Sequence, residues 1–136
     1  MTTSIMTVDA DDSYGTASRS DDDADDVGAI ANRSSASILG SESTAEIARG
    51  AGVPEDQITV IEDSTSFEFG NFTVTLWPVG HAPIGWNGSV PFDGSIEEPL
   101  NMPQPISAWR MGGAYTVIIE HPQGTALVQG SASYTK

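Results

Sequence analysis

The stretch ASILGSESTAEIARGAGVPEDQITVIED, residues 36–63, decides how the chain is expected to fold. Its first residues are short and apolar and end at Gly40, which is typical of a buried strand. Ser43 and Glu46 then have the spacing of a capping box, and Gly50 is a stop signal for a helix. The last part of the stretch is rich in β-branched residues, and its apolar and polar residues alternate. The stretch therefore predicts a strand, a helix and a second strand in succession.

After Pro54 the hydrophobic pattern has a period of two. Strands are expected at QITVIED (57–63), FEFGNFTVTLWPV (67–79), AYTVIIEHP (114–122) and TALVQGSAS (125–133). Gly70-Asn71 and Gln123-Gly124 are expected hairpin turns. Residues 80–113 form a long segment rich in glycine and proline, and a loop of this length is usually functional or disordered.

The N-terminal side of the chain is strongly acidic, because eight of the 19 acidic residues fall within residues 9–26. Residues 1–20 hold few large apolar side chains, so we expect a disordered or loosely attached acidic segment there. DDVGAIANR predicts a helix from Asp26, and residues 21–136 are expected to form one domain.

The aspartate run SRSDDDADDVGAIA, residues 18–31, has three interpretations. The favoured one is a solvated acidic segment that leads into a helix, where negative charge suits the N-terminal end. The second is the remnant of a metal site that uses Asp22 or Asp23. The third is a calcium loop, but in DADDSYG the glycine comes one place late and the distal bidentate glutamate is missing.

Composition excludes several classes of function. The chain has 136 residues, enough for one domain, and no cysteine, so it has no disulfide and no thiolate metal site. A net charge of −14 with five basic residues argues against nucleic acid and anionic membranes as partners. The same acidity favours a halophilic source. The N-terminus lacks the basic and apolar regions of a signal peptide, so we expect a cytoplasmic protein.

Residues 22–133 show an ordered series of segments that resembles one known family. DDADDVGAIANR is similar to the helix after an H-x-H-x-D-H motif, and residues 36–63 to the strand–helix–strand that follows it. FEFGNFTVTLWPVGHAP and AYTVIIEHPQGTALVQGSAS are similar to the two hairpins that come next. Together they resemble the metallo-β-lactamase superfamily, within it the lactonase-like metallohydrolases. The resemblance implies an α+β fold of the αββα type, here partial, with zinc as cofactor.

The resemblance also assigns residues. The motif falls on Ser18, Ser20, Asp22 and Asp23, or one residue earlier on Ala17, Arg19, Asp21 and Asp22. Asp22 then keeps the family's aspartate and is the candidate catalytic residue. His81, in VGHAP, matches a ligand histidine, so the candidate metal ligands are His81, Asp22 and Asp23. The family's bridging aspartate falls on Ser131, and its opening strands and final histidine have no counterpart.

These departures leave three accounts: a truncated gene product, which is favoured, a degenerate paralogue, or a half-domain that a partner chain completes. The expected function is that of a fragment or degenerate metallohydrolase, weak or inactive, whose family hydrolyses an ester, a lactone or a phosphoester with zinc. The alternative is a non-catalytic acidic remnant or interaction protein. Its exposed sheet edges would pair with a partner chain or with a second copy.

Five further residues carry no strong functional signal. Trp77 is expected in the core, whereas Trp86 and Trp109 are open between lining a substrate cleft and covering the core. His121 is expected to be exposed at a hairpin turn. Ser131 has no G-x-S-x-G context, so a serine nucleophile is not expected.

Overall fold

The computed structural model describes residues 5–6, 17–83, 86–110 and 113–129, and within these the side chains from Asp26 onward. Its helices are α1 (Ala17–Ser34) and α2 (Glu42–Gly50), with short 3₁₀ turns η1 (Glu55–Gln57) and η2 (Ile106–Ala108). Its strands are β1 (Ile5–Met6), β2 (Ser37–Gly40), β3 (Ile58–Val60), β4 (Thr65–Phe69), β5 (Phe72–Val79), β6 (Ala114–His121) and β7 (Gly124–Gln129). The chain is therefore α+β, as the sequence predicts.

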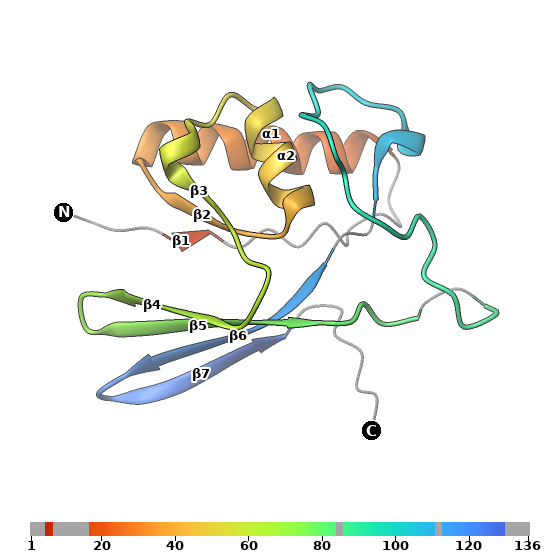
Figure 1. Ribbon diagram of the computed structural model, residues 1–136. Coiled ribbons are helices and arrows are strands. Elements are labelled where there is room, and N and C mark those ends of the chain that lie inside the picture. The colour runs from red at the N-terminus through yellow and green to blue at the C-terminus, as the bar shows by residue number, and fades with distance from the viewer. Residues whose placement is uncertain (1–4, 7–16, 84–85, 111–112, 130–136) are drawn as a thin grey trace.

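The first half of the described chain forms a small parallel sheet, called sheet A. Its strand order is β1-β2-β3, and α1 and α2 are the crossovers between consecutive strands. Parallel crossovers are right-handed in nearly all proteins, so two such crossovers in one direction place both helices on the same face of the sheet. Figure 1 shows both helices on one side of sheet A.

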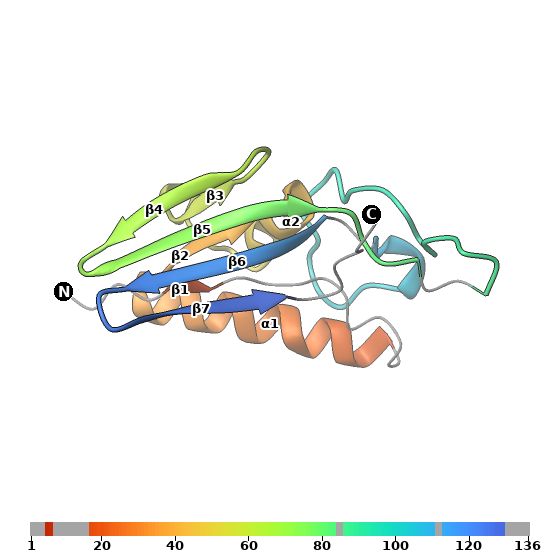
Figure 2. The ribbon, with the colours of Figure 1, turned by 90° about the horizontal axis from the view of Figure 1, so that it is seen from below.

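The second half forms a four-stranded antiparallel sheet, called sheet B, in the order β4-β5-β6-β7. Register pairs Leu76 with Val117, and Val117 with Val128. Sheet B lies against the face of sheet A that the helices leave open, so the layers are helices, sheet A and sheet B (Figure 1). Viewed from below, sheet B lies in front of α1, and no helix covers its outer face in the described part of the chain (Figure 2).

Strand β2 supplies the core on both of its faces. Ile38 packs on the helix side in a cluster with Val27, Ala31, Ala48 and Val53. Leu39 packs on the opposite side, between the two sheets, in a cluster with Ile61, Val74, Leu76 and Val117. A hydrogen bond of 2.8 Å from the Tyr115 hydroxyl to the Ile61 carbonyl also joins the sheets.

Several local predictions are confirmed. Strand β2 ends at Gly40, α2 ends at Gly50, and β4 and β5 are joined by the turn Gly70-Asn71. Gly70 adopts a φ of 63°, a conformation that glycine reaches without strain. The second hairpin turns one residue earlier than expected, because β6 ends at His121 and β7 already begins at Gly124.

The predicted capping box is wrong. The N-cap of α2 is Ser41, whose side chain accepts a hydrogen bond from the Thr44 amide. Ser43 is instead buried inside the helix, where its Oγ accepts a hydrogen bond of 2.9 Å from the amide of Ile96. A serine thus caps α2 two positions earlier than predicted, which leaves Ser43 able to accept a hydrogen bond from the long loop.

The N-terminal helix is longer than its sequence pattern indicates. It begins at Ala17 rather than near Asp26, and Ile5–Met6 pairs in parallel with Ser37 and Ile38. Within residues 1–20 the structure describes β1 at residues 5–6 and α1 from residue 17, and residues 1–4 and 7–16 lie outside the described residues. The expectation of a disordered or loosely attached segment there stays a prediction. Within the described part of the chain, no helix has the length and apolar character needed to cross a membrane.

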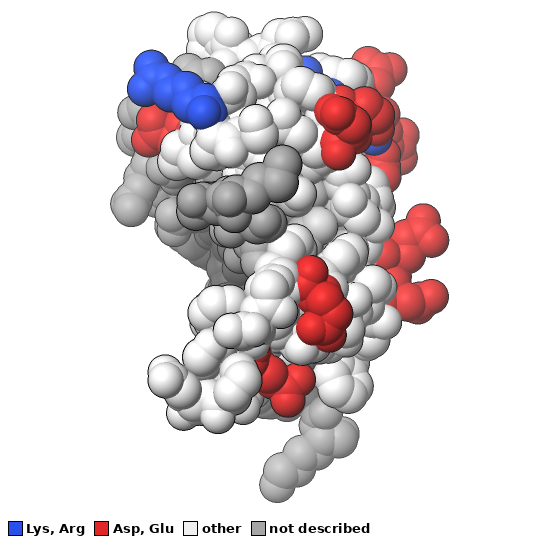
Figure 3. Space-filling model, turned by 90° about the vertical axis from the view of Figure 1, so that its left-hand side faces the viewer, with Lys and Arg blue, Asp and Glu red and all other residues white. Residues whose placement is uncertain are grey.

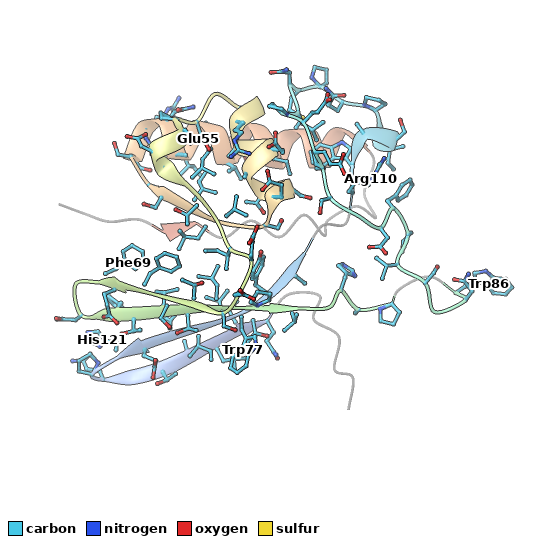
Figure 4. All side chains as sticks on the ribbon, in the orientation of Figure 1. Glu55, Phe69, Trp77, Trp86, Arg110 and His121 are labelled. Atoms are coloured by element: carbon cyan, nitrogen blue, oxygen red, sulfur yellow. The ribbon has the colours of Figure 1, made fainter. Side chains whose placement is uncertain are left out.

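The prediction for Trp77 is wrong, whereas Trp109 takes one of the two positions left open for it. Trp77, expected in the core, is 55% exposed on the outer face of sheet B, because residues of β5 alternate and Leu76 takes the inner face. Trp109 is buried and packs with Ile47 of α2, so it covers the core. Trp86 is fully exposed (Figure 4).

The segment 80–113 is docked on α2 rather than loose. Ile96, Leu100 and Trp109 form a buried cluster with Ile47. The Leu100 amide donates to the Glu46 carbonyl at 3.2 Å. A Cβ on Gly50 would lie 1.8 Å from the Leu100 carbonyl oxygen, so this close approach requires glycine.

We expect Leu76→Ala to lower the free energy of unfolding by about 2–5 kcal/mol, because Leu76 is fully buried between the sheets and its removal leaves a cavity. Ile30→Ala, the truncation of a large apolar side chain at a 51% exposed position of α1, is the control and should cost far less. Urea unfolding of both variants measures this difference. Equal losses would contradict the two-sheet core.

Candidate functional site

His81 lies just after β5, where that strand leaves sheet B. The side chain is half-buried, and its Nδ1 lies 2.8 Å from the carbonyl oxygen of Ala82. A backbone contact of this kind fixes the ring orientation, as second contacts of ligand histidines do. The position at a strand end therefore fits a ligand, but it equally fits a structural histidine.

The other two candidate ligands belong to a different layer. Asp22 and Asp23 lie within α1, on the helix side of sheet A, whereas His81 follows a strand of sheet B. Sheet A lies between these two layers (Figure 1). The backbone thus does not bring the three predicted ligands to one place, and Ser131 lies outside the described residues.

The described part of the chain contains no other candidate metal centre. Among the described residues, no group of three or more His, Asp or Glu side chains could hold a metal ion. A catalytic zinc site needs about three protein ligands and an open position. The described residues therefore offer no preformed set of three such ligands.

The strongest polar cluster surrounds Arg49 near the end of α2. Its guanidinium binds Glu55 through two hydrogen bonds, from Nε at 3.0 Å and from Nη2 at 2.7 Å. Nη1 donates to Glu46 and, at 3.3 Å, to Glu42. The cluster ties α2 to the turn that precedes β3, so its geometry is that of a structural clamp.

The carboxylates of this clamp differ in their exposure to solvent. Glu46 is only 5% exposed, and its Oε2 has no hydrogen-bond partner in the described part of the chain. The two hydrogen bonds from Arg49 lower the pKa of the exposed Glu55 carboxyl, and those bonds also raise the pKa of Arg49. Arg49 therefore compensates a buried carboxylate that has no other ion pair among the described residues.

An open hollow of about 360 Å³ lies where the long loop packs on α2. It is lined by Ser95, Ile96, Glu97, Glu98, Leu100, Ala108 and Arg110. The Arg110 guanidinium already donates to the carbonyls of Ser107 and Trp109, both at 2.8 Å. The hollow therefore has charges of both signs, from Glu97, Glu98 and Arg110.

His121 is half-buried rather than exposed as predicted. Its ring packs on Phe72 with centroids 4.7 Å apart, and its Nδ1 accepts a hydrogen bond from the Gln123 amide. A shallow hollow of about 270 Å³ beside it is lined by Asn71, Thr73, Glu120, His121 and Pro122. These contacts close the ends of the two hairpins, which is a structural role (Figure 4).

The sequence contains a local signal for the Arg49 clamp. Glu46 and Arg49 have the i, i+3 spacing of a helical ion pair, and Glu42 precedes Arg49 by two turns on the same face. The burial of Glu46 could not be foreseen, because the loop that covers it comes from residues 96–109. Figure 3 shows the surrounding face, on which acidic side chains outnumber basic ones.

Comparisons of the chain with models of protein families, with curated proteins and with solved structures found no match.

We expect Arg49→Met to lower the free energy of unfolding at neutral pH by about 1–3 kcal/mol, because it leaves the buried Glu46 carboxylate without its partner. Arg33→Met is the control, since Arg33 is exposed and has no ion pair among the described residues. Thermal melting measures both. The double variant Arg49→Met, Glu46→Leu should recover much of the loss.

The same clamp gives a pH dependence with a defined sign. Because Arg49 lowers the pKa of Glu55 in the folded chain, this contribution to stability is present above the ordinary carboxyl pKa of 4.5. It is lost as the pH falls through the lowered value. The gap in stability between the wild type and Arg49→Met should therefore narrow below pH 4.5. A gap that widens on acidification would contradict the clamp.

Proposed function

We propose that the chain is a degenerate or incomplete member of the metallo-β-lactamase superfamily in which zinc-dependent hydrolysis of an ester, a lactone or a phosphoester is weak or lost. The observation that carries the proposal is the layer order of helices, sheet A and sheet B (Figure 1). The resemblance implies an αββα sandwich, and these layers correspond to its first three. The strand–helix–strand β2, α2 and β3 at residues 36–63 supports the proposal, because the resemblance implies the same succession of elements there.

The bounds of α1 bear on where the family's motif would lie. The motif precedes a helix, but Ser18, Asp22 and Asp23 are inside α1. A motif that precedes α1 falls instead on TVDADDSYGT, residues 7–16, which lies outside the described residues. That segment also contains aspartates and no histidine. In each of these registers the imidazole ligands of the first metal site are missing.

The donor set supports loss of the hydrolytic centre. Zinc, when bound in such a family, supplies a hydroxide that attacks a carbonyl or phosphoryl centre. His81 is the one imidazole that the resemblance assigns to a metal, and it follows a strand of sheet B, whereas Asp22 and Asp23 lie within α1. A catalytic zinc ion needs about three protein ligands and His81 supplies one, so we propose no step through the metal.

The proposal predicts a small response to zinc. A site filled at a hundred times its dissociation constant would add about 2.7 kcal/mol of stability. We expect Zn²⁺ at matched excess to add much less, and the protein to retain less than one equivalent after gel filtration. Thermal melting with and without Zn²⁺, combined with metal analysis, measures both quantities.

Two variants make this experiment decisive. His81→Ala removes the candidate ligand, and His121→Ala removes the other histidine of the chain as the control. One tightly held zinc ion that is lost in His81→Ala and kept in His121→Ala, together with hydrolysis of a test lactone, would overturn the proposal. An intact metallohydrolase would then be the better interpretation.

A second candidate function is that of an interaction protein. Strand β7 supports it, because all six of its residues are exposed at the end of sheet B. An exposed edge strand is a template for pairing with another chain. In this case sheet B acts as a binding surface and the acidic surface keeps the chain soluble.

A further inference from the structure

The two edges of sheet B differ in charge. β4 carries Glu68 and follows Glu62 and Asp63, and carboxylates on an edge oppose pairing with an acidic chain. Strand β7 (Gly124–Gln129) contains neither a charged residue nor a proline. An uncharged edge of this kind, in a chain of net charge −14, is where a second copy meets the least repulsion.

Among the described residues, the backbone of β7 has one hydrogen-bonding side that no other strand pairs with. His121 and Gly124 close the two-residue turn, and such a closing pair is hydrogen-bonded. Hydrogen-bonded and non-hydrogen-bonded pairs alternate along an antiparallel ladder. The pair Ile118–Leu127 is therefore non-hydrogen-bonded, and the N–H and C=O of Leu127 point away from β6.

Two neighbouring residues of β7 expose apolar side chains, one on each face of sheet B. On the outer face Leu127 is 59% exposed, beside Ile118 of β6. On the inner face Val128 is 52% exposed, beside Val117. Another strand at this edge would cover the two apolar faces while it satisfies the backbone, and each gain favours the pairing.

We propose that β7 pairs with β7 of a second copy, antiparallel and about a twofold axis at Leu127. Leu127 then lies opposite Leu127 of the other copy, and Ala126 lies opposite Val128. The strand is complementary to itself in this register, since apolar residues meet on both faces. The two sheets B join into one continuous sheet. The inference is independent of metallohydrolase descent, because it uses the edge strand alone.

Salt dependence follows from the charges. Two chains of net charge −14 repel each other, and the Debye length falls from about 10 Å at 0.1 M to about 3 Å at 1 M salt. The dimer should therefore strengthen as KCl rises over this range. Sedimentation equilibrium at protein concentrations up to about 1 mM, where weak pairs associate, measures the dissociation constant.

Two lysine variants locate the interface. Leu127→Lys places a charge at the centre of the proposed pair and should weaken association about tenfold or more, a change of about 1.4 kcal/mol. Ser66→Lys places the same charge on the outer face of β4, the opposite edge, and should leave association unchanged. A wild type that stays monomeric at high salt, or equal losses in both variants, would overturn the proposal.

Single cysteines test the register, because the chain has none of its own. In the proposed pair the two Cα atoms at position 127 lie about 5.5 Å apart, within the range of about 4.4–6.8 Å that a disulfide spans. Those at position 125 are offset by four residues, about 14 Å. Under mild oxidation in high salt, Leu127→Cys should form covalent dimers quickly and Thr125→Cys slowly. Equal rates would contradict the twofold axis at Leu127.

Discussion

The structure depends on the two-sided burial of strand β2. Ile38 faces the helices and Leu39 faces sheet B, and each is almost fully inaccessible to solvent. Strands covered on both faces read as short apolar runs, which is what residues 36–40 show. Because β2 is also the middle strand of sheet A, its two faces define the helix layer on one side and the second sheet on the other.

Polar contacts then hold the parts around this strand in place. The Arg49 clamp fixes α2 to the turn before β3, and Ser43 binds the backbone of the long loop at Ile96. Tyr115 joins the sheets through the Ile61 carbonyl, and its burial raises the pKa of its hydroxyl. These residues are polar but serve the fold, so their burial is not a sign of catalysis here.

Local signals explain what the sequence could predict. Gly40, Gly50 and the turn Gly70-Asn71 act through backbone conformation, which is decided by a few neighbouring residues, and each lies where it was expected. The prediction that Trp77 lies in the core was wrong, because burial depends on distant parts of the chain. Its burial depends on whether a layer covers the outer face of sheet B, and alternation along β5 alone does not say which face is covered.

The geometry of the candidate site depends even more on long-range packing than the burial of Trp77 does. The position of His81 at the end of β5 follows from the strand pattern, but its distance from α1 depends on the stacking of three layers. The long loop gave no periodic signal, yet Ile96, Leu100 and Trp109 pack on α2. Long-range packing of this kind decides both the buried clamp and the separation of the expected ligands.

Amide hydrogen exchange in the presence of a chelator tests most directly whether the two sheets and the helices form one metal-free core. The account predicts that the slowest amides lie in β2, β5 and β6 and share one free energy of opening, which equals that of global unfolding. Different opening free energies for sheet A and sheet B would contradict a common core. Protection that appears only after Zn²⁺ is added would contradict a fold that is independent of metal.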